Sequence, residues 1–147
     1  MSYTVRRLFE RDFFNLQDQW DALLNTSNAD PLFMSWAWQV SWWETWGNKL
    51  DLELLLLAVF DGDENLVGIA PLYLSSVTTP LGWKVRRLHV VGNAWKLGPT
   101  VRTEYVGVIV ERRQQQSVMD TLSDYLAGLD WDEMIFADAS ARSMNMV

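Results

Sequence analysis

The feature that most constrains the fold is a pair of apolar segments joined by an acidic turn. Residues 52–60 (LELLLLAVF) are followed by DGDEN and then by residues 66–76 (LVGIAPLYLSS). Asp and Gly favour tight turns, so this pattern predicts an antiparallel hairpin. The first arm is apolar at consecutive positions, so we expect an interior strand covered on both faces. Pro71 cannot donate a ladder hydrogen bond, which predicts a bulge or an edge within the second arm.

The rest of the chain reads as strands and helices around this hairpin. Residues 3–9 alternate between apolar and polar, and Asp12 is placed to cap one helix over residues 13–27, where apolar residues recur at helical spacing. Glycine, proline and asparagine without periodicity predict a loop at residues 93–104. The remaining expected elements are strands at residues 84–92, 105–110 and 131–139, and a helix at residues 111–129.

Five tryptophans lie within the segment 35–47 (SWAWQVSWWETWG), which the pattern predicts to be a helix capped by Ser35. We expect Gly47 to end it in the left-handed conformation. At 100° per residue the helix is apolar over more than half of its circumference, so we predict that most of the five rings are buried. The alternative is that Trp38 or Trp46, near the ends, flanks a ligand groove.

Composition excludes several classes of function. The 147 residues are sufficient for one domain, carry a net charge of -7 and include no cysteine. Nucleic acid is not expected as a partner, because its binding requires clustered Lys and Arg. The absence of thiols excludes disulfides and thiolate metal sites and fits a cytoplasmic location. The longest apolar run, residues 54–60, is too short for a membrane span.

The order of the expected elements is that of the GNAT acyltransferase fold: strand, two helices, three or four antiparallel strands, strand, helix, strand. Within this fold, the tryptophan segment PLFMSWAWQVSWWETWG, the hairpin, VRRLHVVGN, EYVGVIV and WDEMIFADA resemble the amino-terminal half of CelD-like, FemAB-related acetyltransferases linked to polysaccharide synthesis. The resemblance implies an α/β (α+β) fold with a mixed, mostly antiparallel sheet flanked by helices. It also implies that residues 1–147 form one GNAT-like domain, the first of two tandem halves in a longer protein.

The resemblance places the acyl-CoA turn of a GNAT half at residues 110–122, VERRQQQSVMDTL. Cofactor-binding halves have a glycine-containing Q/R-x-x-G-x-G/A turn there, in which backbone N–H groups reach the pyrophosphate. This segment contains no glycine. Arg112 and Arg113 could attract phosphate, but side chains such as Gln116 should obstruct the close approach, so we expect no cofactor to be bound by this chain. In complete members of the family, acyl-CoA is implied.

Three residues are candidates for catalysis. His89 is the only histidine, and a lone histidine predicts a packed strand residue unless it faces a cleft, where it would suit proton transfer. Glu104 and Tyr105 lie at the head of a strand, where polar groups meet ligands. The acidic residues of the hairpin turn lack the spacing of a calcium loop, so we expect a solvated turn and no metal site.

The sequence therefore supports two hypotheses about function. The first is an acceptor-side half of an enzyme that transfers an acyl group from acyl-CoA to a sugar, amino-sugar or amine. The second is a non-catalytic GNAT-like module for binding or dimerisation. Because a single half leaves one flank of the sheet uncovered, we expect a homodimer or a separate second half to pair with the surface of residues 131–136 and the strand 105–110.

Overall fold

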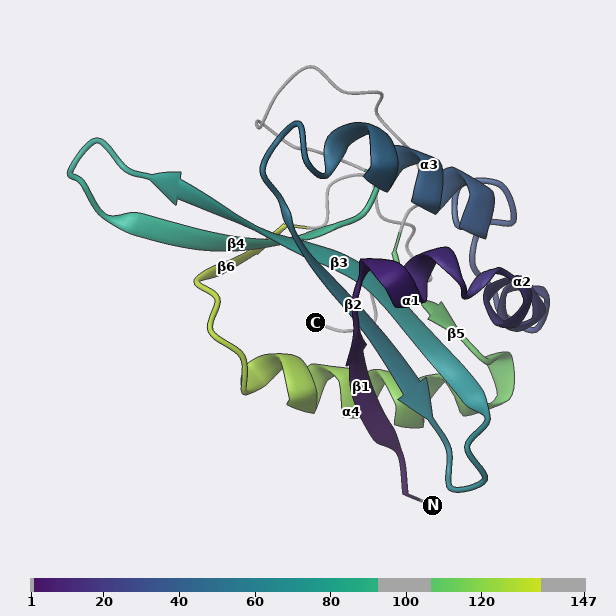
Figure 1. Ribbon diagram of the computed structural model, residues 1–147. Coiled ribbons are helices and arrows are strands. Elements are labelled where there is room, and N and C mark those ends of the chain that lie inside the picture. Colours follow the sequence, from purple (N-terminus) through teal and green to yellow (C-terminus); the bar gives the residue numbers. More distant parts are fainter. Residues whose placement is uncertain (1, 93–106, 136–147) are drawn as a thin grey trace.

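The predicted hairpin lies at the centre of a six-stranded mixed sheet (Figure 1). The computed structural model describes residues 2–92 and 107–135. The strands run in the order β1-β2-β3-β4-β6. Strand β5 also pairs with β3, on the same side as β4 but further along the strand. Their bounds are β1 Thr4–Leu8, β2 Glu53–Phe60, β3 Leu66–Thr78, β4 Lys84–Val90, β5 Ile109–Val110 and β6 Glu133–Ile135. All described pairings are antiparallel except β4 with β6, which is parallel.

Strand β2 is interior, as its apolar run predicts. It pairs with β1 on one side and β3 on the other, and Leu54 to Val59 are all buried. The turn is ordered by the Asp61 carboxylate, which accepts hydrogen bonds from the backbone N–H groups of Asp63 and Asn65. The hydrogen bond from the Asn65 backbone is the main reason why the pKa of Asp61 is lowered. This is the solvated acidic turn that the sequence predicts.

The expectation of a bulge or an edge at Pro71 holds on one side of β3 only. Pro71 is buried in the middle of β3 and pairs with Leu56 of β2 without a bulge. On the other side the partner strand is interrupted: β4 ends opposite Leu72, and β5 begins opposite Ile69. The N–H of Val91 donates to the Pro71 carbonyl at 2.8 Å, on the side where the interruption lies. The missing N–H of the proline therefore falls where no strand needs it.

The single helix predicted over residues 13–27 is in fact two helices. Helix α1 spans Glu10–Phe14 and α2 spans Gln17–Asn25. Asp12 does not cap the helix from outside, because it is the third residue of α1 and its carboxylate accepts from the N–H of Phe9 at 3.0 Å. The break at Asn15 and Leu16 turns the chain so that the buried Phe13 ring stacks on Trp20, with 5.4 Å between the ring centroids.

The tryptophan-rich helix α3 spans Trp36–Trp46, and Ser35 caps it as predicted by accepting from the N–H of Trp38. Gly47 does not adopt the left-handed conformation: its φ is −55° and its ψ is −53°. The chain continues in turns to Asp51, which has the positive φ of 53°. Gly47 is required for space instead, since a Cβ there would lie 2.8 Å from Cε2 of Trp43.

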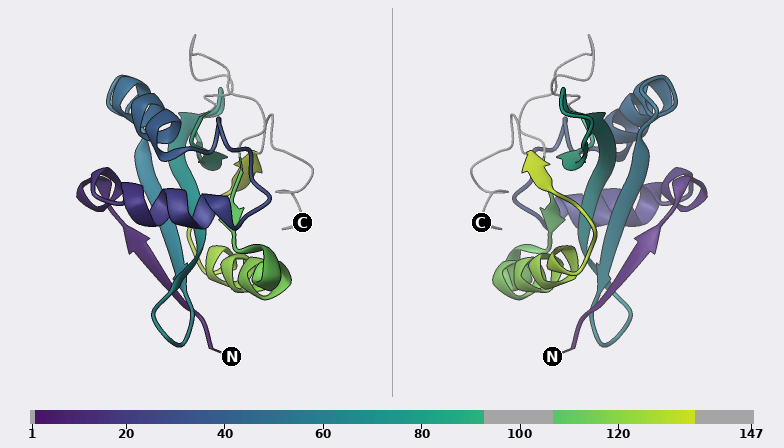
Figure 2. Two further views of the ribbon diagram at one scale, coloured as in Figure 1. Left: turned by 90° about the vertical axis from the view of Figure 1, so that its right-hand side faces the viewer. Right: turned by 90° about the vertical axis from the view of Figure 1, so that its left-hand side faces the viewer.

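Helices cover both faces of the sheet (Figure 2). Helices α1, α2 and α3 lie on one face, where Trp42 and Trp43 of α3 pack against Tyr73 of β3. Helix α4, Gln115–Ala127, lies on the opposite face and follows a 3-10 turn, Arg112–Gln114. Its Val118 packs so closely on β3 that a Cβ at Gly68 would lie 2.6 Å from Cγ1 of Val118. The expected fold, a mixed and mostly antiparallel sheet flanked by helices, is confirmed.

Candidate functional site

The outer side of α3 carries an open groove of about 520 Å³. Only Trp42 and Trp43 of the five clustered tryptophans are buried, so the prediction that most of them are buried is wrong. The helix presents one side to the sheet, and Trp36, Trp38 and Trp46 stay partly exposed. The groove is lined by Trp38, Trp42 and Trp46, together with small residues that include Ala37, Ser41 and Thr45. The alternative prediction, that Trp38 or Trp46 flanks a groove, therefore describes this surface better.

His89 is buried among aromatic and hydroxyl groups on the face of the sheet that α3 covers. It lies directly opposite Tyr73 in the β3–β4 register, and the two rings stack at 4.8 Å with 7° between their planes. Its Nε2 lies 2.9 Å from Oγ of Ser75, and only 2% of the residue is exposed. The sequence expectation of a packed strand residue agrees with this burial.

The surroundings of His89 oppose its protonation. Burial, and secondarily the charge of Arg87, lower the pKa of His89 to about 4. Burial also raises the pKa of the stacked Tyr73 far above its usual range. At pH 7 the imidazole is therefore neutral, and its pKa lies well below the value near 7 that favours a general base. A role for His89 in proton transfer stays a prediction, with Ser75 as its hydrogen-bonded neighbour.

The other two candidate residues, Glu104 and Tyr105, lie outside the described residues. Within the described ranges 2–92 and 107–135, no cluster of His, Asp and Glu has the arrangement to hold a metal ion. The helices in those ranges are also too short or too polar to cross a bilayer.

The turn between β5 and α4, where the resemblance places acyl-CoA, is occupied by the protein's own contacts. The N–H of Arg112 donates to the carbonyl of Thr26, and its guanidinium donates to the Ser27 carbonyl at 2.8 Å and to Oδ1 of Asn28 at 2.9 Å. Ser27 and Glu111 also form an isolated β-bridge. The loop after α2 is thus held against this turn.

The remaining residues of the turn do not form a phosphate cradle either. The N–H of Gln114 donates to the carbonyl of Glu111, closing the 3-10 turn, and the Gln116 amide donates to Asp120 at 2.8 Å. Arg113 is exposed. A pyrophosphate site needs a run of free backbone N–H groups that it can approach closely. The N–H groups of Arg112 and Gln114 are already bonded and no glycine opens the turn, so the residues present here fit that group poorly.

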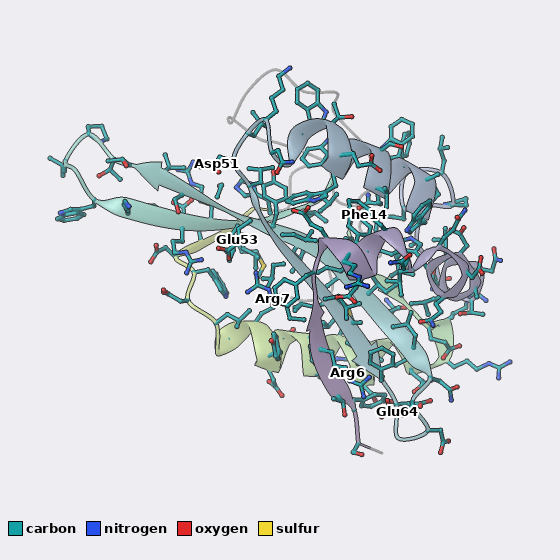
Figure 3. All side chains as sticks on the ribbon, viewed as in Figure 1. Arg6, Arg7, Phe14, Asp51, Glu53 and Glu64 are labelled. Carbon is teal, nitrogen blue, oxygen red and sulfur yellow. The ribbon has the colours of Figure 1, made fainter. Side chains whose placement is uncertain are left out.

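A polar pocket of about 330 Å³, which the sequence analysis missed, lies where β2 begins. It is lined by Asp51, Glu53, Ser76 and Arg86, among others. Oε2 of Glu53 lies 3.5 Å from Nη2 of both Arg7 and Arg86, so three strands contribute to one charge cluster. Figure 3 labels Arg7 and Glu53 of this cluster. These residues are far apart in sequence and carry no motif, so only the strand register brings them together.

A buried glutamine, Gln39 of α3, was also missed. Its Nε2 donates to the carbonyl of Phe33 at 2.9 Å and to that of Val91, just beyond β4, at 3.3 Å, while its Oε1 has no partner. It is fully buried. A polar residue on the otherwise apolar side of α3 is the one sequence signal that could have identified it. Its contacts hold the start of α3 against the end of β4.

No family model matches the sequence, and the comparison with curated proteins found no match. Solved structures do overlap with the fold at low similarity. Glucosamine-6-phosphate N-acetyltransferase from Arabidopsis thaliana has 11% identity and a TM-score of 0.45, over 96% of this chain and 84% of that one. An acetyltransferase from Trypanosoma brucei has 15% identity and a TM-score of 0.45, over 97% of this chain and 87% of that one. Ribosomal-protein-alanine N-acetyltransferase from Brucella melitensis biovar Abortus 2308 has 12% identity and a TM-score of 0.44, over 99% of this chain and 86% of that one.

Proposed function

We propose that the chain is the acceptor-side half of a GNAT-like acyltransferase of the CelD-like, FemAB-related type, acting on a sugar, an amino-sugar or an amine. The support is the order of its own elements together with the sequence resemblance. Helices α1 and α2, which stand in place of one expected helix, and helix α3 precede the antiparallel hairpin of β2 and β3, and α4 later leads from β5 to β6, which is parallel to β4. This is the order that the resemblance implies for one GNAT half.

The acceptor side is favoured by one observation, the closed turn between β5 and α4. Arg112, the first cation of that turn, is used by Ser27 and Asn28 of the α2–α3 loop. A cofactor pyrophosphate would have to displace these contacts and would still find side chains where glycine is needed. In this proposal acyl-CoA is held by a separate half, and this chain contributes the surface that receives the acceptor.

A non-catalytic binding module is the second candidate, and the β3–β4 hairpin favours it. Beyond Ser75 the two strands project from the body of the protein as a two-stranded arm (Figure 1). At its tip Leu81 is 78% exposed and Trp83 is 70% exposed. Exposed large apolar side chains at the end of an arm are typical of a surface that contacts a partner.

Calorimetric titration of the purified chain separates these candidates. With acetyl-CoA we expect weak or no binding, and micromolar binding that survives physiological salt would overturn the acceptor-side assignment. With glucosamine, glucose and a simple alkyl amine, we expect saturable binding of at least one. If none of them binds while the chain associates with itself or with a partner protein, the non-catalytic module is the correct function.

An Arg112→Ala variant tests the closed turn itself. Removing the guanidinium frees the Ser27 carbonyl and Asn28 but creates no backbone cradle, so acetyl-CoA should bind no better than to the wild type. Arg113→Ala is the matched control, since it removes an equally exposed charge from the same turn. Tighter acetyl-CoA binding by Arg112→Ala alone would mean that the turn is a gated cofactor site.

A further inference from the structure

The turn at the end of the β3–β4 arm is closed by its own hydrogen bonds. The N–H of Thr79 donates to the Trp83 carbonyl at 2.7 Å, and the N–H of Gly82 donates to the Thr79 carbonyl at 2.9 Å. The N–H of Trp83 donates to the Thr79 hydroxyl at 3.1 Å. Pro80 has no N–H, and Gly82 supplies the positive φ of 85° in this turn. Four of the residues 79–83 therefore carry no unsatisfied backbone N–H.

The side chains of the same turn are apolar and face solvent. Leu81 is 78% exposed and Trp83 is 70% exposed, and Pro80 is exposed as well. A Cβ at Gly82 would have no heavy atom within 4 Å, so open space adjoins the turn. Figure 1 shows the turn at the far end of the arm, away from the helices. An apolar end whose backbone donors are bonded internally can leave water with few polar groups left unpaired.

The small area of this end favours a lipid surface over a protein partner. A whole aromatic side chain buries about 150 to 250 Å², and a leucine is smaller. At their exposed fractions, Leu81 and Trp83 together offer less than half of the roughly 800 Å² that each partner contributes to a stable protein interface. A bilayer needs no matching surface and takes up single apolar side chains, and tryptophan is enriched where hydrocarbon meets headgroups.

The charge of the arm is positive in an acidic chain. Residues 66–92, which include both strands of the arm, carry Lys84, Arg86 and Arg87 and no acidic residue. The two arginines are paired with acidic side chains at the base of the arm, whereas Lys84 is exposed directly after Trp83. A lysine at this position is attracted by anionic headgroups. Arg86 and Trp83 are about 10 Å apart along an extended strand, which exceeds the screening length of about 8 Å, so the acids at the base oppose this attraction weakly.

We propose that the tip of the arm, residues 79–84, inserts Leu81 and Trp83 into the surface of a lipid bilayer that contains anionic lipids, with Lys84 among the headgroups. Two apolar side chains give a weak and reversible contact, which brings the protein to a membrane surface without a membrane-spanning segment. This inference is compatible with either function proposed above. Vesicle binding involves neither acetyl-CoA nor an acceptor, so its failure would leave the calorimetric titrations unaffected, and their failure would leave this proposal in place.

The test is a titration of the whole protein with vesicles of phosphatidylcholine containing one-third phosphatidylserine, and with vesicles of phosphatidylcholine alone. Co-sedimentation measures binding. NMR of the tryptophan indole N–H groups with spin-labelled lipid reports insertion, and the Trp83 signal is identified by its loss in Trp83→Phe. We expect tighter binding to the anionic vesicles and broadening of the Trp83 signal. No binding at millimolar lipid, equal binding to both kinds of vesicle, or an unchanged Trp83 signal in the bound protein would overturn the proposal.

Apolar side chains removed from two places supply the first matched comparison. Leu81→Ser should weaken binding to the anionic vesicles by at least about tenfold, since most of the leucine side chain would no longer leave water. Leu32→Ser is the control, because Leu32 is 57% exposed on the α2–α3 loop, away from the arm. Both variants should fold, since both side chains are largely exposed. Equal affinities of the two variants would contradict the proposal.

A reversed charge supplies the second comparison. Lys84→Glu should weaken binding to the anionic vesicles, and Lys84→Arg should restore it. Lys49→Glu changes the net charge by the same amount at an exposed position after α3, and should bind like the wild type. If Lys49→Glu weakens binding as much as Lys84→Glu does, the membrane senses the net charge of the protein and not the arm, and the proposal is wrong.

Discussion

His89 should make the stability of the protein depend on pH, because it is the only histidine and its burial keeps it neutral. Its pKa is about 4 in the native chain and near 6.5 when exposed, so between these values the unfolded chain binds the proton and the native chain does not. The free energy of unfolding should therefore fall as the pH drops through this window, by about 2 kcal/mol between pH 7.5 and pH 5. Urea titrations at several pH values measure it.

The control for this prediction is His89→Gln, which keeps a polar group beside Ser75 but cannot titrate. Carboxylates have unperturbed pKa values near 4, so between about pH 5.5 and 6.5 the histidine should dominate the slope. The variant should be nearly flat over that interval. An equal slope in the wild type and in His89→Gln would show that His89 is not the group that titrates.

Trp43 is one of the two tryptophans through which α3 packs against the sheet. It is 3% exposed and packs against Tyr73, so Trp43→Ala should lower the free energy of unfolding by about 3 to 5 kcal/mol. The same replacement at Trp83, which is 70% exposed, should cost no more than about 0.5 kcal/mol. Denaturant titrations compare the two, and a loss below about 1 kcal/mol for Trp43→Ala would contradict the buried role.

At the scale of elements, the contact between β3 and α4 depends on a glycine. A Cβ at Gly68 would lie 2.6 Å from Cγ1 of Val118 and 3.3 Å from Cβ of Val59, so Gly68→Ala should destabilise the protein by about 1 to 3 kcal/mol. Gly62→Ala in the hairpin turn is the matched control, because its nearest neighbour would be 4.0 Å away.

A double variant shows whether steric overlap is the cause. Val118→Ala removes the methyl group that a Cβ at Gly68 would meet, so it should recover part of the stability lost in Gly68→Ala, although it is destabilising alone. Thermal melting of the four proteins gives the coupling between the two sites. Strictly additive losses would mean that α4 shifts away without strain and that the close approach is not needed.

The elements that the sequence predicts well are those decided by local pattern. The hairpin, the capped tryptophan helix and α4 follow from apolar spacing and from turn residues such as Asp61 and Ser35. The break between α1 and α2 and the conformation of Gly47 were missed, because packing against distant residues decides them. The contacts of the candidate site were harder to predict than the elements. Arg112 is held by Ser27, 85 positions away, and no sequence spacing predicts such a contact.

At the scale of the whole molecule, the sheet ends at β6, which has a partner only on its β4 side in the described part of the chain. We predict self-association, or pairing with a separate second half, through the surface of residues 131–136 and the strand that ends in β5, because open strand edges are templates for pairing. Phe136 and residues 105–106 of this surface lie outside the described residues. The net charge of -7 should oppose association only modestly, since charges are screened beyond about 8 Å at 0.15 M salt.

Light scattering over a concentration series tests this prediction. We expect the mean mass to rise towards that of a dimer, with little change in Leu81→Ser, which alters the tip of the β3–β4 arm and leaves β6 intact. A chain that stays monomeric at hundreds of micromolar, without an apolar flank that binds dye, would be a self-sufficient domain. Loss of association in Leu81→Ser would assign the contact to the arm instead.

The interruption opposite Pro71 has an evolutionary consequence. Strands β4 and β5 lie along the same side of β3, and the chain stays bonded to β3 as far as Val91 and pairs with it again at Ile109. Because its two ends are fixed by β3 itself, insertions or deletions between them need not shift the register of any strand. Proline at this position makes the gap permanent, since no uninterrupted neighbour could be fully bonded there. Relatives could therefore differ widely in length at this point and still share one sheet.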